Sequence, residues 1–188
     1  MSQAAVYPAA LEVRQRGRSI TGRFTYGITT TIGDRGRRRK EIITPGAFDF
    51  AIDEGRRIDA LVGHRYDRPL GNTAAGTLAF VQEDEALDFE VRLPSDQPQY
   101  MRDTVVMVES GLIGGVSPGF RVPPLDVVPD AEEEIPEPGN PDVTIRRINA
   151  AVLFEMSLVT RPAYDETSVE VRSALARLRR NPAAALTL

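Results

Sequence analysis

The order of strand-like and helix-like segments limits the fold of this chain more than any other feature of its sequence. Apolar or alternating segments of strand length recur along it, at residues 11–30, 41–44, 58–63, 71–80, 87–93, 113–122, 143–149 and 150–160. Helices are expected only around residues 45–54, 99–110 and 169–180, so strands and helices do not alternate regularly. This pattern predicts an α+β domain, mainly an antiparallel β-barrel, closed or nearly closed, flanked by a few helices.

The 188 residues suit a single domain whose core is large enough to fold without disulfides or metals. We expect this domain to span residues 13–180, with a flexible segment at 1–12 and a flexible tail at 181–188. Within it, residues 31–40 are expected to form a flexible basic loop, solvated rather than bound to an acidic partner. Residues 123–142 are rich in Pro, Asp and Glu, and are expected to form a flexible acidic loop.

Composition excludes several kinds of site. The chain has no cysteine, which excludes disulfides, thiolate zinc sites and thiol nucleophiles, and its one histidine, His64, excludes a multi-histidine metal site. A net charge of −4 argues against nucleic acid as the main ligand. There is no run of 18 apolar residues and no secretory signal pattern. We therefore expect a soluble intracellular protein that needs no metal or cofactor and has no membrane or nucleic-acid partner.

His64 is the sole imidazole that could act as a base near neutral pH. It follows the short apolar segment 58–63 and precedes a polar turn, a position from which a side chain can project into a cleft. There it could take a proton from a hydroxyl and return it to a leaving amine. The alternative is a turn histidine without a chemical role.

Ser117 is the strongest candidate for a nucleophile. Glycines on both sides of it allow close approach of the backbone and leave the hydroxyl accessible, although a kinked strand with a bulge also explains them. A serine reacts only with a base within hydrogen-bond reach. Gly115 to Gly119 match the Gly-x-Ser-x-Gly elbow of α/β-hydrolases, but no helix pattern follows and Pro118 stands where the turn would begin.

Glu155 lies in an otherwise apolar strand-like segment. Alternation places Glu155, Ser157 and Val159 on one face of that strand. Because burial of a carboxylate without a partner is costly, Glu155 either points outward or is buried with a hydrogen-bond partner. An inward Glu155 could orient His64 and stabilise its protonated form.

Four motifs, in this order, resemble the prohead maturation serine proteases of tailed phages with the HK97-type capsid. These are similar in fold and mechanism to the herpesvirus assembly protease. The resemblance covers about residues 22–171, and the motifs stand at residues 44–48, 63–71, 115–120 and 154–164. Each motif is weak alone, but the only histidine of the chain falls in the expected one.

The resemblance implies a β-barrel serine endopeptidase with Ser117 as nucleophile and His64 as general base. The herpesvirus branch uses a second histidine, which this chain lacks. Glu155, in the corresponding C-terminal strand, is therefore the expected third member of the triad.

The resemblance also places the oxyanion-binding loop just after that strand, near Arg161. Pro118 has no amide hydrogen, so it cannot give the contact that the residue after a nucleophile often supplies. Gly119 or the Arg161 loop is expected to supply it instead.

The family's substrates are the scaffold segment of the major capsid protein and the protease itself, cleaved inside the procapsid in the host cytoplasm. The resemblance therefore implies the capsid protein as partner, autocleavage, and a possible homodimer through the helix expected at residues 169–180. Packing of that helix on its own barrel is the simpler expectation. The rival interpretations are an inactive capsid assembly or scaffold component with the same barrel, and a small all-β binding module with a glycine-rich groove.

Overall fold

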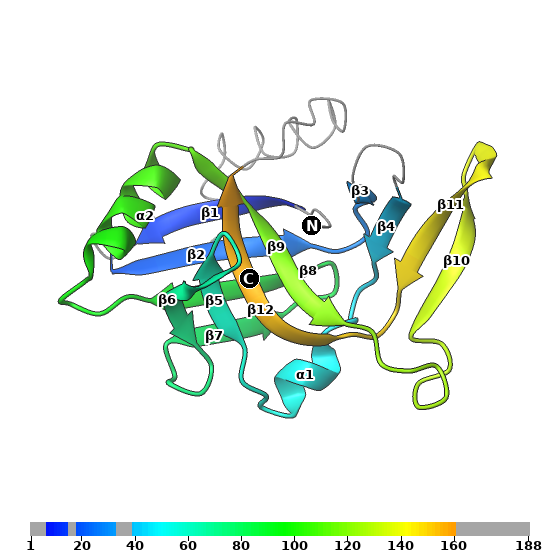
Figure 1. The fold of residues 1–188 in the computed structure, drawn as a ribbon, viewed down its shortest axis with the longest axis horizontal. Coiled ribbons are helices and arrows are strands. Elements are labelled where there is room, and N and C mark those ends of the chain that lie inside the picture. The colour runs from blue at the N-terminus through cyan, green and yellow to red at the C-terminus, as the bar shows by residue number, and fades with distance from the viewer. Residues whose placement is uncertain (1–6, 15–17, 33–38, 161–188) are drawn as a thin grey trace.

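The computed structural model describes residues 7–14, 18–32 and 39–160, which form two sheets and two helices (Figure 1). The larger sheet has eight strands in the order β6-β5-β12-β9-β1-β2-β8-β7. Their bounds are β1 Tyr7–Arg14, β2 Ser19–Thr25, β5 Asp59–Val62, β6 Arg65–Asn72, β7 Leu78–Gln82, β8 Ala86–Arg92, β9 Ile113–Arg121 and β12 Val152–Thr160. The smaller sheet has the order β10-β11-β4-β3, formed by β10 Glu132–Glu137, β11 Asn140–Ile148, β4 Arg39–Ile43 and β3 Thr30–Ile32. The helices are α1 Asp49–Asp53 and α2 Gln99–Glu109.

The α+β class is confirmed, but the larger sheet is not a closed barrel. Its strands pair antiparallel, except that β5 runs parallel to β12. The edge strands β6 and β7 meet at the turn that joins them, where the Asn72 N–H donates to Thr77 Oγ1 at 3.0 Å and the Thr77 N–H to the Asn72 carbonyl at 3.1 Å. No strand ladder joins β6 to β7 over residues 7–14, 18–32 and 39–160, so the sheet stays open in its hydrogen-bonding order.

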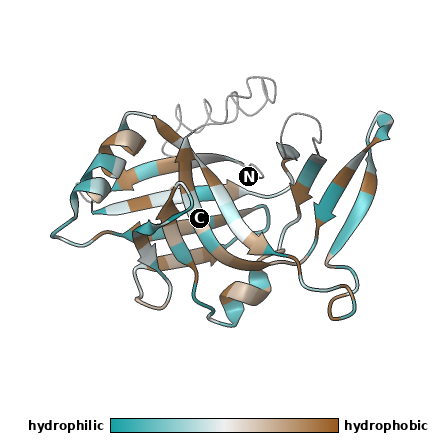
Figure 2. Ribbon diagram, viewed as in Figure 1, coloured by the Kyte–Doolittle hydropathy of each residue, from teal (hydrophilic) through white to brown (hydrophobic). Residues whose placement is uncertain are grey.

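The main core lies on one face of the larger sheet. Rings from β1, β2 and the segment before α1 pack edge-on or tilted, with centroids 4.9 Å apart for Tyr7 and Phe24 and 5.9 Å apart for Phe24 and Phe48. Strands β9 and β12 add Val116, Met156 and Leu158 to the same buried cluster. Figure 2 shows β12 as mainly hydrophobic and the β10–β11 hairpin as mainly hydrophilic. Since strand side chains alternate between faces, the neighbours of these core residues point to the opposite face.

The helix expected at residues 99–110 is confirmed as α2, which ends where Gly111 takes a left-handed backbone with φ +74°. The helix expected at 45–54 is shorter than predicted. Gly46 has φ +76°, which is incompatible with a continuous helix, so residues 45–48 form turns and α1 begins at Asp49.

The expectation of a flexible acidic loop at residues 123–142 is wrong for much of that segment. Residues 132–137 form β10, which pairs antiparallel with β11 and places Ile135 opposite Ile145. β10 is an edge strand, where a proline is tolerated and acidic side chains reach solvent. Arg146 of β11 further offsets the acidic charge through ion pairs with Glu132 and the buried Glu41.

Other boundaries also differ from the sequence prediction. The segment at 11–30 divides into the β1–β2 hairpin and β3, and the strand expected at 71–80 is interrupted by the β6–β7 turn. β1 begins at Tyr7, a residue 1% exposed, so the segment expected to be flexible at 1–12 is partly built into the sheet. The expected basic loop contributes the ends of β3 and β4, whereas residues 33–38, the helix at 169–180 and the tail at 181–188 lie outside the described residues.

None of the helices in the described residues is long and apolar enough to cross a membrane.

Candidate active site

The polar residues of interest lie on the face of β9 and β12 opposite the core. In the antiparallel ladder, Ser117 stands directly across from Ser157, and Gly119 across from Glu155. Directly opposed residues share a face, so these four positions form two adjacent rows. Ser117 and Ser157 are both 0% exposed, and Glu155 is 4% exposed. The outward orientation considered for Glu155 is therefore wrong.

His64 reaches this face from a two-residue hairpin turn. Val62 of β5 pairs with Arg65 of β6, and the residues between them, Gly63 and His64, have φ of +62° and +61°. Two successive positive φ values are the signature of a type I′ turn, in which glycine or asparagine usually stands. Among the described residues, His64 is the one non-glycine residue with positive φ.

Backbone contacts hold this turn against β12. The Gly63 N–H donates to the carbonyl of Leu158 at 2.9 Å, and the His64 N–H donates to Ser157 Oγ at 3.0 Å. A left-handed residue with a side chain is strained by roughly 1–2 kcal/mol, so it persists where such contacts favour it. The turn thus places the histidine ring beside the carboxylate of Glu155.

His64 Nδ1 lies 2.5 Å from Glu155 Oε1. The hydrogen bond to this carboxylate raises the pKa of His64, partial burial opposes the rise, and the negative charge of Glu155 adds to it. An ionised carboxylate can only accept, so Nδ1 carries the proton and the neutral ring has its lone pair on Nε2. Nε2 is buried and has no hydrogen-bond partner within the described part of the chain. This arrangement prepares Nε2 to act as a base.

Ser157 is a residue whose role the sequence analysis missed. Its hydroxyl donates to Glu155 Oε2 and accepts the backbone N–H of His64 at 3.0 Å. It therefore links the carboxylate to the turn that carries the imidazole. The alternation that placed it two residues from Glu155 on the same face was the signal that could have identified it.

Gly119 has a steric role beside Glu155. A Cβ at this position would lie 2.4 Å from Glu155 Cγ and 2.5 Å from Oε1, closer than Cβ atoms approach other atoms in proteins. Only glycine leaves room for the buried carboxylate in its observed position. The oxyanion contact expected from Gly119 stays a prediction.

The structure brings together His64, Glu155 and Gly119 and places Ser117 in the neighbouring row, across from Ser157. Arg161 lies outside the described residues. Over the ranges that the structure describes, no group of three or more His, Asp or Glu side chains is arranged to hold a metal ion. The arrangement can accept a proton at Nε2, next to a strand that carries a serine between glycines.

A family model described as caudovirus prohead serine protease matches residues 11–180 of the chain. No curated protein and no solved structure matches it. The expected similarity in fold to the herpesvirus assembly protease therefore stays a prediction.

Proposed function

Since this chain belongs to the caudovirus prohead serine protease family, we propose that it is an active serine endopeptidase with Ser117, His64 and Glu155 as its triad. Its proposed substrates are the scaffold segment of the major capsid protein and its own chain, cleaved inside the procapsid in the host cytoplasm. The observation that carries this proposal is the 2.5 Å contact from His64 Nδ1 to the buried Glu155, which leaves Nε2 available as a base.

In the proposed mechanism, the Ser117 hydroxyl attacks the scissile carbonyl carbon while its proton passes to His64 Nε2. Glu155 holds Nδ1–H and stabilises the imidazolium. Collapse of the tetrahedral intermediate breaks the C–N bond, and His64 returns the proton to the leaving amine. Water, deprotonated in turn by His64, then hydrolyses the acyl-enzyme and regenerates Ser117.

The oxyanion contacts are proposed to come from backbone amides near Arg161. Pro118 has no amide hydrogen. Gly119 lies beside the Glu155 carboxylate, where a second negative charge would be repelled. A donor in an oxyanion hole contributes about 3–4 kcal/mol to transition-state stabilisation in other enzymes.

The test is co-expression with the major capsid protein of the same phage, followed by intact-mass measurement of every product. The wild-type protein and the control Ser95→Ala, at an exposed serine before α2, are expected to shorten the capsid protein. Ser117→Ala is expected to leave it full-length. Shortening by the Ser117→Ala variant would refute the assignment of the nucleophile.

A second candidate function is a catalytically inactive assembly component, and the complete burial of Ser117 favours it. Substrate can reach this serine only if the atoms covering it move. A phosphonylating probe directed at serine nucleophiles separates the two functions. Labelling of Ser117 that depends on His64 identifies an enzyme, whereas an unlabelled protein in assembled proheads identifies the assembly component.

The homodimer proposed through residues 169–180 rests on a segment outside the described structure, and sedimentation over a range of concentrations tests it.

A further inference from the structure

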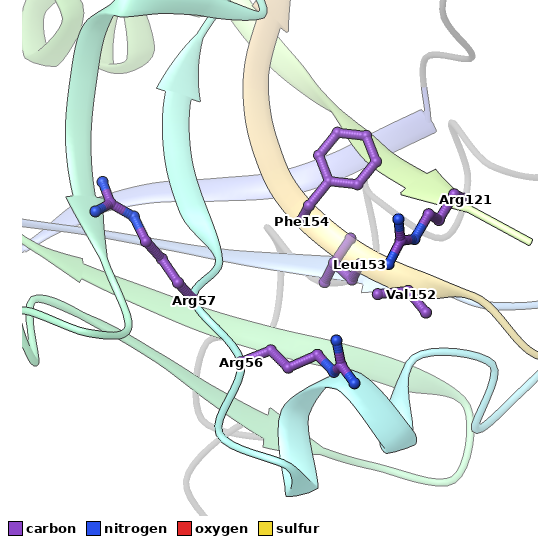
Figure 3. A pocket seen from close by; sticks show the side chains of 6 residues that line it. All are labelled: Arg56, Arg57, Arg121, Val152, Leu153 and Phe154. Atoms are coloured by element: carbon purple, nitrogen blue, oxygen red, sulfur yellow. The ribbon is translucent and has the colours of Figure 1, made fainter. Parts of the chain in front are cut away.

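A pocket of about 500 Å³ lies where β9 ends and β12 begins. It is lined by three arginines and three apolar residues, Arg56, Arg57, Arg121, Val152, Leu153 and Phe154 (Figure 3). The proposed mechanism does not use this pocket. Its lining combines cationic groups with an aromatic ring that is 40% exposed, an unusual state for a phenylalanine.

The pocket continues the row of β9 that contains Ser117. Ser117, Gly119 and Arg121 are alternate residues of β9 and therefore share a face. Arg121 pairs across the ladder with Val152, the first residue of β12, which also lines the pocket. Arg121 lies four residue steps along β9 from Ser117, which is about 13 Å at roughly 3.3 Å per step. An extended peptide with its scissile bond at Ser117 would reach the pocket within about four residues.

Two of the three guanidinium groups have no carboxylate partner among the described residues. Arg57 pairs with Asp59 at 2.9 Å, and its side chain points away from the other two in Figure 3. Arg56 and Arg121 form no ion pair with any described residue, and both extend toward Val152 and Leu153. Arg56 also lies over the ring of Phe50, 5.2 Å from its centroid, which fixes part of its side chain.

The shape and charge of this lining select one kind of occupant. A carboxylate fits between two guanidinium groups through charge-assisted hydrogen bonds, and a short aliphatic stem can contact Val152 and the ring of Phe154. A glutamate side chain has both parts. The net charge of −4 on the whole chain disfavours nucleic acid, the other polyanion that arginines commonly bind.

We propose that this pocket is a specificity subsite for a glutamate side chain of the substrate, three to five residues from the scissile bond. The proposal rests on the protease function proposed above and extends it to the class of sequence that is cleaved. The subsite would let the enzyme distinguish its capsid substrate from other extended segments by one acidic residue at a fixed distance.

The test uses a mixed library of synthetic peptides incubated with purified full-length protein, with cleavage positions read by mass spectrometry. The wild-type protein is expected to prefer glutamate over glutamine at one position three to five residues from the cleaved bond, by about 5- to 20-fold in kcat/KM. Arg121→Glu is expected to abolish that preference and to favour lysine or arginine at the same position. The control Arg92→Glu, at an exposed arginine of β8, should keep the glutamate preference.

A second measurement does not depend on turnover. The Ser117→Ala protein is expected to bind a glutamate-containing peptide several-fold more tightly than its glutamine analogue in fluorescence anisotropy, and added Arg121→Glu should remove the difference.

The outcomes separate the two proposals. Cleavage without any acidic preference would overturn the subsite and leave the protease intact. Absence of cleavage of every peptide and of the capsid protein would overturn both. A single-stranded oligonucleotide whose binding is lost in Arg121→Glu, with equal binding of both peptides, would assign the pocket to nucleic acid and overturn the subsite.

Discussion

Removal of the Ser157 hydroxyl tests how the site is held together, because this group contacts both the Glu155 carboxylate and the turn that carries His64. It donates to Glu155 Oε2 and accepts the N–H of His64 at 3.0 Å. The Ser157→Ala change leaves a buried carboxylate with one donor fewer and a strained turn with one anchor fewer. Both losses are expected to misorient the imidazole without altering its chemical identity.

The size of the effect follows from these contacts. A hydrogen bond to a charged group contributes about 1.5–3 kcal/mol, and the second, neutral one contributes about 1 kcal/mol. If misorientation of the imidazole removes about 1.5–3 kcal/mol of transition-state stabilisation, kcat falls by about 10- to 150-fold. KM should change little, since the Ser157 hydroxyl is bonded to Glu155 and to the His64 backbone and has no part in substrate binding in the proposed mechanism. The free energy of unfolding should fall by about 2.5–4 kcal/mol, because both hydrogen bonds are lost.

The assay is steady-state cleavage of a peptide, together with urea unfolding of each variant. Ser19→Ala is the matched control, because Ser19 is also 0% exposed and its hydroxyl has no partner among the described residues. It should keep kcat, and its stability should be unchanged or higher. An unchanged kcat in Ser157→Ala would refute the positioning role. Complete loss in Ser157→Ala, with cleavage retained in Ser117→Ala, would identify Ser157 as the nucleophile.

Two further predictions concern the carboxylate. Because the hydrogen bond to Glu155 raises the pKa of His64, the neutral base appears at higher pH, and the acid limb of kcat/KM should lie above the ordinary histidine value of 6.5. Glu155→Gln should move that limb to lower pH and reduce the plateau by about 100-fold or more, and an unmoved limb would contradict the pairing. Gly119→Ala should displace the Glu155 carboxylate, whose Cγ would lie 2.4 Å from the new Cβ, and reduce kcat more than 10-fold by the same orientation argument. Gly27→Ala, with φ +73° and open space around it, is a control that costs about 1 kcal/mol of stability and should keep activity.

Local patterns in the sequence account for the elements that were predicted well. Apolar periodicity identified α2 and the strands β5, β8, β9 and β12, because each buries one face against the same core. The same periodicity identified Glu155 as a carboxylate in an apolar strand, whose burial would require a hydrogen-bond partner. In the structure that partner is His64, which lies 91 residues away in the chain.

The β10–β11 hairpin could not be predicted in the same way, since its stability depends on residues distant in sequence. Composition alone predicts that Glu132 belongs to a solvated acidic run. The structure pairs it with Arg146 of the neighbouring strand. Arg146 in turn reaches Glu41 of β4, which also accepts a hydrogen bond from Tyr7 at 3.2 Å. Compositional arguments treat such charges as solvated, and they fail where a nonlocal partner neutralises them.

Gly119 has a steric role that the motif around Ser117 does not suggest. Glycines around Ser117 indicated an accessible nucleophile, but at position 119 the missing side chain serves the carboxylate on the neighbouring strand. The distinction depends on register, because only the pairing of Gly119 with Glu155 brings the two together. A shift of one residue would turn Glu155 to the core face, where no imidazole could meet it. The ladder between β9 and β12 therefore fixes both the chemistry of the site and the tolerance of its glycine to substitution.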